Sequence, residues 1–204
     1  MTNRPLFVTG IGTGIGKTVV SAILVEKLKA DYWKPVQSGD LDNSDSLKIK
    51  KLISNTQSFI HPETYRLTQP FSPHKSADID GIIIDQNKFI IPTTDNILII
   101  EGAGGLMVPL NSRFLMIDLI KQLDVEVVLI SQNYLGSINH TLLSVQTLKN
   151  YGIPVEGIIF NGAKDTYSEE FILSYSKVKY LGHIPEFDVL NKENIIAAGR
   201  GIDL

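Results

Sequence analysis

The feature that most constrains this chain is a glycine-rich turn between an apolar run and an amphipathic stretch, within Leu6–Leu28. The turn ends in Gly16, Lys17 and Thr18. Glycines let backbone N–H groups converge on phosphate oxygens, and the N-terminus of a following helix adds positive potential. A lysine and a hydroxyl at these positions can reach the outer phosphates of a nucleotide and Mg²⁺. The segment therefore predicts a strand, a phosphate loop and a helix.

The spacing of this loop differs from two common nucleotide-binding patterns. The usual phosphate loop, G-x-x-x-x-G-K-[ST], has glycine where this chain has Ile11, and Gly10 instead leaves a five-residue spacer. The dinucleotide fingerprint G-x-G-x-x-G fails at Ile15 or at Lys17, depending on where it begins. We therefore set dinucleotide binding aside. The alternative of a plain turn with a surface lysine is disfavoured by the strand and helix patterns on either side.

Short apolar runs alternate with segments of helical spacing along the chain, which is typical of a doubly wound α/β fold with a mostly parallel sheet. The predicted strands are Leu6–Thr9, Tyr32–Val36, Ile97–Ile100, Val125–Ile130 and Val155–Phe160, and the predicted helices are Thr18–Lys29, Ser44–Ile53, Phe114–Leu123 and Ile138–Asn150. We interpret Pro62–Pro73 as an active-site insertion, whereas the passage from Asn191 has little periodicity. The 204 residues are expected to form a single domain.

Composition excludes several classes of protein. The net charge is −3, which disfavours a general nucleic-acid binder. The chain has no Cys, so it has no disulfide, thiolate metal site or cysteine nucleophile. The N-terminus shows no targeting segment and the apolar runs are far shorter than the roughly 20 residues that span a bilayer, so we expect a cytoplasmic protein.

Three further residues are candidates for phosphate chemistry. Glu101 ends the most apolar run, where a parallel sheet gathers its ligands, and a carboxylate there can hold Mg²⁺. Lys34 follows the second predicted strand and could be a second cation for developing charge, or a solvated strand-end lysine. Asp45 stands at a predicted helix start, so a capping role and a metal role are equally open.

Taken in order, these residues resemble the dethiobiotin synthetase family. The resemblance rests on the loop Gly10–Thr18, the turn Lys34–Gly39 and the segment Asn43–Asp45. The later landmarks are Ser72–His74, Glu101–Gly105 with Pro109, Leu135–His140, Asn161 and Leu181–Pro185. The match covers nearly the whole chain. Two positions depart from the family pattern: Gly14 replaces a frequent acidic residue, and Phe171 falls where an aromatic hydroxyl is expected.

The resemblance implies a P-loop homodimer that converts 7,8-diaminononanoate, CO₂ and ATP with Mg²⁺ to dethiobiotin, ADP and phosphate, through a carbamate and a carbamic-phosphoric anhydride. It implies Lys17 and Lys34 as catalytic cations. The implied Mg²⁺ ligands are Thr18, Asp45 and Glu101. The implied nucleotide contacts are Gly14, Ile15, Gly16, Lys17, Thr18, Val19, Asn161, Pro185, Glu186, Phe187 and Glu193. The implied substrate contacts are Thr13, Ser38, Gly136, Ser137, Ile138 and Asn139, the last four supplied by the partner subunit.

Three rival functions share the loop. A partitioning-type ATPase has a signature lysine where this chain has Gly12, and the chain lacks a basic amphipathic tail for a membrane. An amide-forming ligase for corrinoids is usually fused to a glutaminase with a cysteine nucleophile, which a chain without Cys does not contain. A small-molecule kinase differs only in releasing its phosphorylated product. The identity of the product separates this last rival from the ligase.

Overall fold

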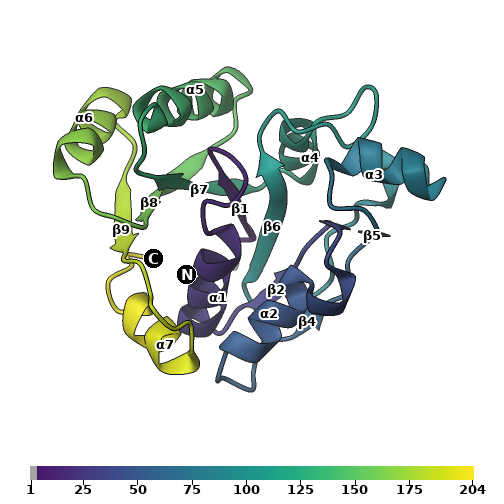
Figure 1. Cartoon of the computed structure of the whole chain (residues 1–204), viewed down its shortest axis with the longest axis horizontal. Helices are drawn as coiled ribbons and strands as arrows, with labels where there is room; N and C mark the ends of the chain where they lie inside the picture. The colour runs from purple at the N-terminus through teal and green to yellow at the C-terminus, as the bar shows by residue number, and fades with distance from the viewer. Residues whose placement is uncertain (1–3) are drawn as a thin grey trace.

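The central sheet of the computed structural model, which describes residues 4–204, has seven parallel strands in the order β4-β2-β6-β1-β7-β8-β9 (Figure 1). Its strands are β1 (Leu6–Gly10), β2 (Asp31–Trp33), β4 (Ile60–His61), β6 (Leu98–Gly105), β7 (Glu126–Gln132), β8 (Val155–Asn161) and β9 (Tyr180–Ile184). A two-stranded parallel sheet pairs β3 (Val36–Ser38) with β5 (Tyr65–Leu67). The predicted doubly wound α/β architecture is confirmed.

Helices cover both faces of the central sheet (Figure 1). One face packs against α1 (Lys17–Leu28), α2 (Asp45–Leu52) and α7 (Lys192–Gly199). The other packs against α4 (Met116–Leu123), α5 (Ser137–Asn150) and α6 (Thr166–Ser176), whereas α3 (Pro73–Asp80) packs on the two-stranded sheet. Within residues 4–204, every helix is too short or too polar to span a membrane.

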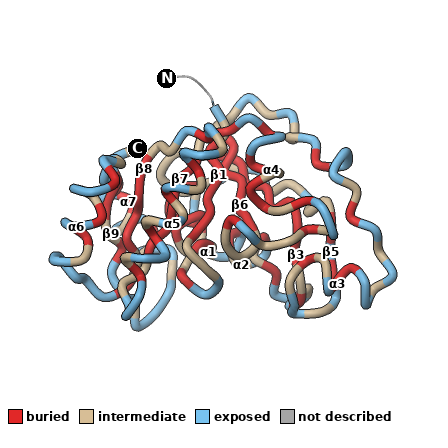
Figure 2. Tube along the Cα trace, turned by 90° about the horizontal axis from the view of Figure 1, so that it is seen from above, coloured by how far each residue is buried: buried red, intermediate tan, exposed pale blue. Residues whose placement is uncertain are grey.

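The central sheet has an apolar core on each face, because successive side chains of a strand point to opposite faces. Phe7 and Ile100 lie in the core under α4 and α5, whereas Val8 and Ile99 lie in the core under α1. Figure 2 shows the buried residues concentrated along the strands, with exposed residues in the surrounding loops. The strands β1, β2 and β6 are thus packed on both faces.

The predicted strand Tyr32–Val36 is wrong as a single element. Strand β2 ends at Trp33, and β3 begins at Val36 in the other sheet. Pro35 lies between them, and a proline cannot donate a ladder hydrogen bond and restricts the residue before it. The break leaves Lys34 outside both strands.

Glu101 also lies elsewhere in its strand than predicted. Strand β6 continues through Gly105, which pairs with Gly10, so Glu101 is inside the strand rather than at its end. The passage from Asn191, which has little periodicity, folds into α7 and packs on α1 through Gly199. Pro62–Pro73 contains β5 and leads into α3.

The N-terminal end of β2 is fixed by one buried carboxylate. Asp31 Oδ1 accepts hydrogen bonds from Phe59 N at 2.8 Å and Asn96 Nδ2 at 2.9 Å, and Oδ2 accepts one from Thr94 Oγ1 at 2.6 Å. His61 Nε2 lies 3.1 Å from Oδ2. Burial alone would raise the pKa of Asp31, but these hydrogen bonds outweigh it and hold the pKa below its usual value. Asp31 therefore ties β4 and the segment before β6 to the strand that leads to Lys34.

We expect Asp31→Asn to lower the free energy of unfolding at pH 7 by about 1.5–3 kcal/mol, since the amide turns N–H groups toward donors. A carboxyl whose folded pKa is depressed stabilises the fold above its unfolded pKa, so the gap from wild type should shrink as the pH falls below 3.8. Urea unfolding between pH 7 and pH values below 3.8 measures the difference in unfolding free energy between variant and wild type. Asp188→Asn, at an exposed position, is the control. Equal unfolding free energies of variant and wild type at pH 7 would show that the hydrogen bonds to Asp31 do not contribute to stability.

Candidate active site

A cavity of about 710 Å³ opens at the carboxyl ends of β1, β2 and β6. It brings together ten of the residues that the sequence analysis assigned: Thr13, Gly14, Gly16, Lys17, Thr18, Val19, Lys34, Ser38, Asp45 and Glu101. These residues come from the phosphate loop and the start of α1, the break after β2, the end of β3, the start of α2 and the middle of β6. The last residues of the predicted insertion, Pro70–Pro73, form another wall.

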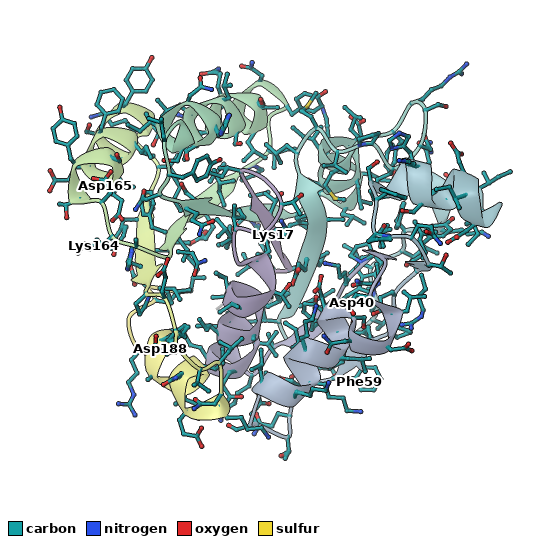
Figure 3. All side chains as sticks on the ribbon, viewed as in Figure 1. Lys17, Asp40, Phe59, Lys164, Asp165 and Asp188 are labelled. Atoms are coloured by element: carbon teal, nitrogen blue, oxygen red, sulfur yellow. The ribbon has the colours of Figure 1, made fainter. Side chains whose placement is uncertain are left out.

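The phosphate loop has the backbone geometry that its glycines permit. Gly16 caps α1 with φ of 88°, in the left-handed region that favours glycine. A Cβ atom there would also lie 2.2 Å from Asn161 Nδ2. That same Nδ2 donates a hydrogen bond to the Ile15 carbonyl at 3.0 Å, so β8 supports the loop. Lys17 Nζ donates to the Gly12 carbonyl at 2.8 Å, and Figure 3 places Lys17 where the loop joins α1.

Lys34 lies between the two carboxylates of the cavity. Its ammonium group donates a hydrogen bond to Glu101 Oε1 at 3.0 Å and another to Asp45 Oδ2. Thr18 Oγ1 donates to the same Glu101 oxygen at 2.9 Å. Lys34 and Glu101 are 4% and 1% exposed, so this charged group is sheltered from water. Segments that are far apart in the sequence thus meet at one polar cluster.

Burial and neighbouring charges shift the pKa values of this cluster. Burial lowers the pKa of Lys17 to about 8, an effect that Glu101 opposes and Lys34 strengthens. Burial would also lower the pKa of Lys34, but Glu101 and Asp45 outweigh it and hold that pKa above its usual value. Burial would raise the pKa of Asp45, but Lys34 keeps it low. At neutral pH the site therefore holds charged Lys34 and Asp45 side by side.

The donor set of this cluster suits Mg²⁺ bound together with a nucleotide. Thr18, Asp45 and Glu101 offer one hydroxyl and two carboxylates, and Mg²⁺ commonly takes one or two carboxylates with phosphate oxygens and waters. The Thr18 hydroxyl bonds to Glu101 and also helps to lower the pKa of Asp45, so the three side chains share one space. Within residues 4–204, no group of three or more His, Cys, Asp or Glu residues could hold a metal alone. The residues present thus fit a cation that shares its coordination with phosphates.

The other predicted nucleotide contacts come from the segment after β9 and the start of α7. Glu186 follows β9, and its Oε1 lies 3.7 Å from the position of a Cβ atom on Gly162. Phe187 packs against the core on the α1 side, and Pro185 precedes both. Glu193 lines a second cavity, of about 480 Å³, which also contacts Thr18 and Val19. The two cavities share Thr18, Val19 and Lys48, so they lie next to each other.

The predicted contacts for the substrate carboxylate lie elsewhere. Gly136, Ile138 and Asn139 line a third cavity, of about 740 Å³, together with Lys164 and Asp165, and Ser137 is the buried first residue of α5. This cavity shares no lining residue with the one around Lys17. Figure 3 places Lys164 and Asp165 on the segment before α6, well away from Lys17. The structure of one chain therefore does not bring Gly136–Asn139 to Lys17.

Sequence reasoning missed two residues of the main cavity and its surroundings. Lys48 lines both nucleotide-side cavities and bonds to Asp40 at 2.9 Å, with Asp45 Oδ1 at 3.6 Å. Its place three residues after Asp45 on a predicted helix was the available signal. Tyr32 donates a hydrogen bond to Glu101, and no signal in the sequence separated it from a core aromatic.

Comparison with known proteins places the chain. The family model described as an AAA domain matches residues 4–194. The ATP-dependent dethiobiotin synthetase BioD of Christiangramia forsetii is 54% identical over 90% of this chain and 88% of its own, and that of Cytophaga hutchinsonii is 50% identical over 95% and 94%. The chain belongs to the ATP-dependent dethiobiotin synthetase family. The proteins of Agrobacterium fabrum and Rhodopseudomonas palustris with the same name are also similar, at 43% and 42% identity.

Solved structures of more distant proteins share the fold of this dethiobiotin synthetase family member. The cell division ATPase MinD of Pyrococcus furiosus superposes with a TM-score of 0.62 at 12% identity, covering 97% of each chain. A ParA family ATPase from Chlorobium tepidum gives 0.58 at 14% identity, covering 96% of this chain and 90% of its own. These likenesses establish the fold alone. They agree with the doubly wound α/β fold described above.

Proposed function

We propose that the cavity around Lys17 and Lys34 carries out ATP-dependent ring closure of 7,8-diaminononanoate with CO₂ to give dethiobiotin. The observation that carries this assignment is the gathering of two buried lysines, two carboxylates and the Thr18 hydroxyl at the phosphate loop. Such a site suits a reaction between two anions, a nucleotide and a carboxylated amine. Membership of the dethiobiotin synthetase family supplies the identity of the substrate.

The reaction divides into three steps. One substrate amine attacks CO₂, forms an N–C bond and loses a proton to give a carbamate. A carbamate oxygen then attacks the γ-phosphorus of ATP, the bond to the β-phosphate oxygen breaks, and ADP leaves. The neighbouring amine finally attacks the carbonyl carbon of the mixed anhydride, phosphate leaves, a proton is lost, and the ureido ring closes.

The chain contributes position and charge to these steps. Lys17 and the backbone N–H groups of the loop hold the outer phosphates, because they line the cavity at the N-terminus of α1. Lys34 lies where the carbamate would approach, and two cations offset the repulsion between carbamate and triphosphate. Thr13 and Ser38 line the cavity on either side and bind the reacting oxygens. No side chain acts as a nucleophile.

Thr18, Asp45 and Glu101 would hold Mg²⁺ in this arrangement. When bound, the cation neutralises charge on the phosphates and on the transferred group. Lys34 already compensates both carboxylates, so it must share them with the cation or turn toward the carbamate. Asn161 and the segment Pro185–Phe187 would contact the base, and Glu193 the sugar.

The chain works as a homodimer in this proposal. Gly136 and Asn139 are exposed at the start of α5, where the N-terminal N–H groups of a helix and its dipole attract an anion. The distal carboxylate of diaminononanoate needs such a site, and the cavity around Lys17 shares none of its residues with the one around Gly136. A partner subunit would bring its Gly136–Asn139 segment to this cavity.

A direct assay tests the function. The protein is incubated with diaminononanoate, bicarbonate, Mg²⁺ and ATP, and the products are identified by mass spectrometry. Dethiobiotin with equal amounts of ADP and phosphate is the expected result. A stable phosphorylated product without ring closure would instead establish a kinase.

We expect Glu101→Gln to raise the Mg²⁺ concentration needed for half-maximal activity by about 10-fold or more, with a smaller change in the KM for diaminononanoate. The amide keeps the shape of the carboxylate but loses the charge that a hard cation prefers. Steady-state titration of Mg²⁺ at saturating ATP measures the effect. Retained activity with an unchanged metal requirement would return Glu101 to a structural role in β6.

A further inference from the structure

Tyr32 is a buried polar side chain that the proposed mechanism does not use. It is 0% exposed, at the centre of β2. Its hydroxyl donates a hydrogen bond to Glu101 Oε2 at 3.0 Å. The other oxygen of that carboxylate, Oε1, accepts hydrogen bonds from Thr18 and Lys34. Each oxygen of Glu101 thus has its own donors.

The register of the sheet explains how Tyr32 reaches this carboxylate. Tyr32 is paired with Ile99, and Glu101 follows Ile99 by two residues on the same face of β6. Tyr32 and Ile99 both belong to the core under α1, the helix that carries Thr18. A tyrosine is long enough to span the diagonal from one strand to a residue two further along its neighbour. The contact is therefore built into the sheet and does not depend on a loop.

The two oxygens of Glu101 have different surroundings. Tyr32, the donor to Oε2, is fully buried and does not line the cavity around Lys17. The donors to Oε1, Thr18 and Lys34, both line that cavity.

We propose that Tyr32 is a positioning residue, which orients Glu101 so that a single carboxylate oxygen is presented to the Mg²⁺ of the nucleotide. The inference rests on the proposed function, because it assigns Glu101 to the metal. Groups that orient a metal ligand typically change metal affinity or activity by about 10–100-fold when they are removed. Tyr32 contacts neither substrate nor phosphate in this scheme and acts through Glu101.

The test compares Tyr32→Phe with a matched control, Tyr65→Phe. Both changes delete one buried hydroxyl, since Tyr65 OH donates to the Asp85 carbonyl at 3.2 Å and accepts from Asp85 N at 2.8 Å, outside the cavity. Calorimetry with a non-hydrolysable ATP analogue measures Mg²⁺ affinity, and thermal unfolding measures stability. We expect Tyr32→Phe to weaken Mg²⁺ binding by about 10-fold or more. Binding of the analogue in EDTA should be unchanged, and Tyr65→Phe should affect only the Tm.

A double-mutant cycle tests the route of the effect. If Tyr32 acts through Glu101, then Tyr32→Phe in the Glu101→Gln background should cause no further loss of Mg²⁺ affinity. If Tyr32→Phe proves hard to purify, all variants are measured in trimethylamine N-oxide, which stabilises the folded state without binding the site. An unchanged Mg²⁺ affinity in Tyr32→Phe, or equal losses in both backgrounds, would overturn the positioning role. Failure of the wild type to make dethiobiotin would instead overturn the proposed function.

Discussion

Replacing Lys17 or Lys34 by alanine should lower kcat at least about 100-fold. Both lysines line the cavity in which we propose that the carbamate meets the triphosphate, and loss of one donor that faces developing charge typically costs about 3–4 kcal/mol. The loss of kcat should be larger than for a lysine exposed to solvent. Lys34 is only 4% exposed, so water cannot take over the interactions of its charge. Single-turnover measurements of ADP formation at saturating ATP separate this effect on the chemical step from weaker binding.

The two lysine variants should differ in stability. Lys34→Ala leaves Asp45 and Glu101 without their shared cation, and breaking a buried ion pair commonly costs about 3–5 kcal/mol. Lys17 makes only a hydrogen bond to the Gly12 carbonyl among the contacts described, so Lys17→Ala should unfold close to the wild-type temperature. Lys50→Ala, an exposed lysine on α2, is the control for both. Wild-type turnover in a folded variant would remove that lysine from the mechanism.

The elements that the sequence predicts well are those whose signal is local. Strand β1 and helix α1 were predicted from an apolar run and a glycine-rich turn, and β7 and β8 from continuous runs of Val, Ile and Leu. The split between β2 and β3 depends on which distant partner each pairs with, because β3 joins β5 and β2 joins β6. Pro35 marks the break locally, but the choice of distant partner strands leaves no pattern within these five residues. Helix α7 escaped prediction because its apolar residues form one run, Ile195–Ala198, instead of recurring at helical spacing.

The residues of the site likewise divide into those with a local sequence signal and those without one. Lys17 and Thr18 could be predicted because the loop, the strand and the helix occupy one continuous segment. Glu101 was recognised through its place on an apolar strand, and its ion pair with Lys34 follows only from the sheet order, which sets β2 beside β6. Tyr32 could not be distinguished from a core aromatic by sequence, since its partner lies in a strand that is 69 residues away along the chain.

Asn139→Asp should raise the KM for diaminononanoate while leaving ATP binding close to wild type. The change places a negative charge in the first turn of α5, beside the proposed site for the substrate carboxylate. A negative charge in the first turn of a helix interacts favourably with the helix dipole, so the variant should fold. It is a better probe than Gly136→Pro, because Gly136 has φ of 102° and proline is fixed near −65°. Gln146→Glu adds the same charge further along α5 and serves as the control.

Mixing Asn139→Asp with Lys17→Ala then tests whether each site is shared between two subunits. In a mixed dimer one site would combine both defects, and the other would combine an intact Lys17 with an intact Gly136–Asn139 segment from its partner. Random exchange makes about half of the dimers mixed, so activity should return to about a quarter of the wild-type value at substrate concentrations where each variant alone is weak. Native mass spectrometry establishes that exchange has occurred. If mixed dimers form and their activity does not rise above the average of the two variants, the substrate carboxylate is held within one chain. Because the cavities around Lys17 and Gly136 share no residue, helix α5 would then have to move within the monomer to bring them together.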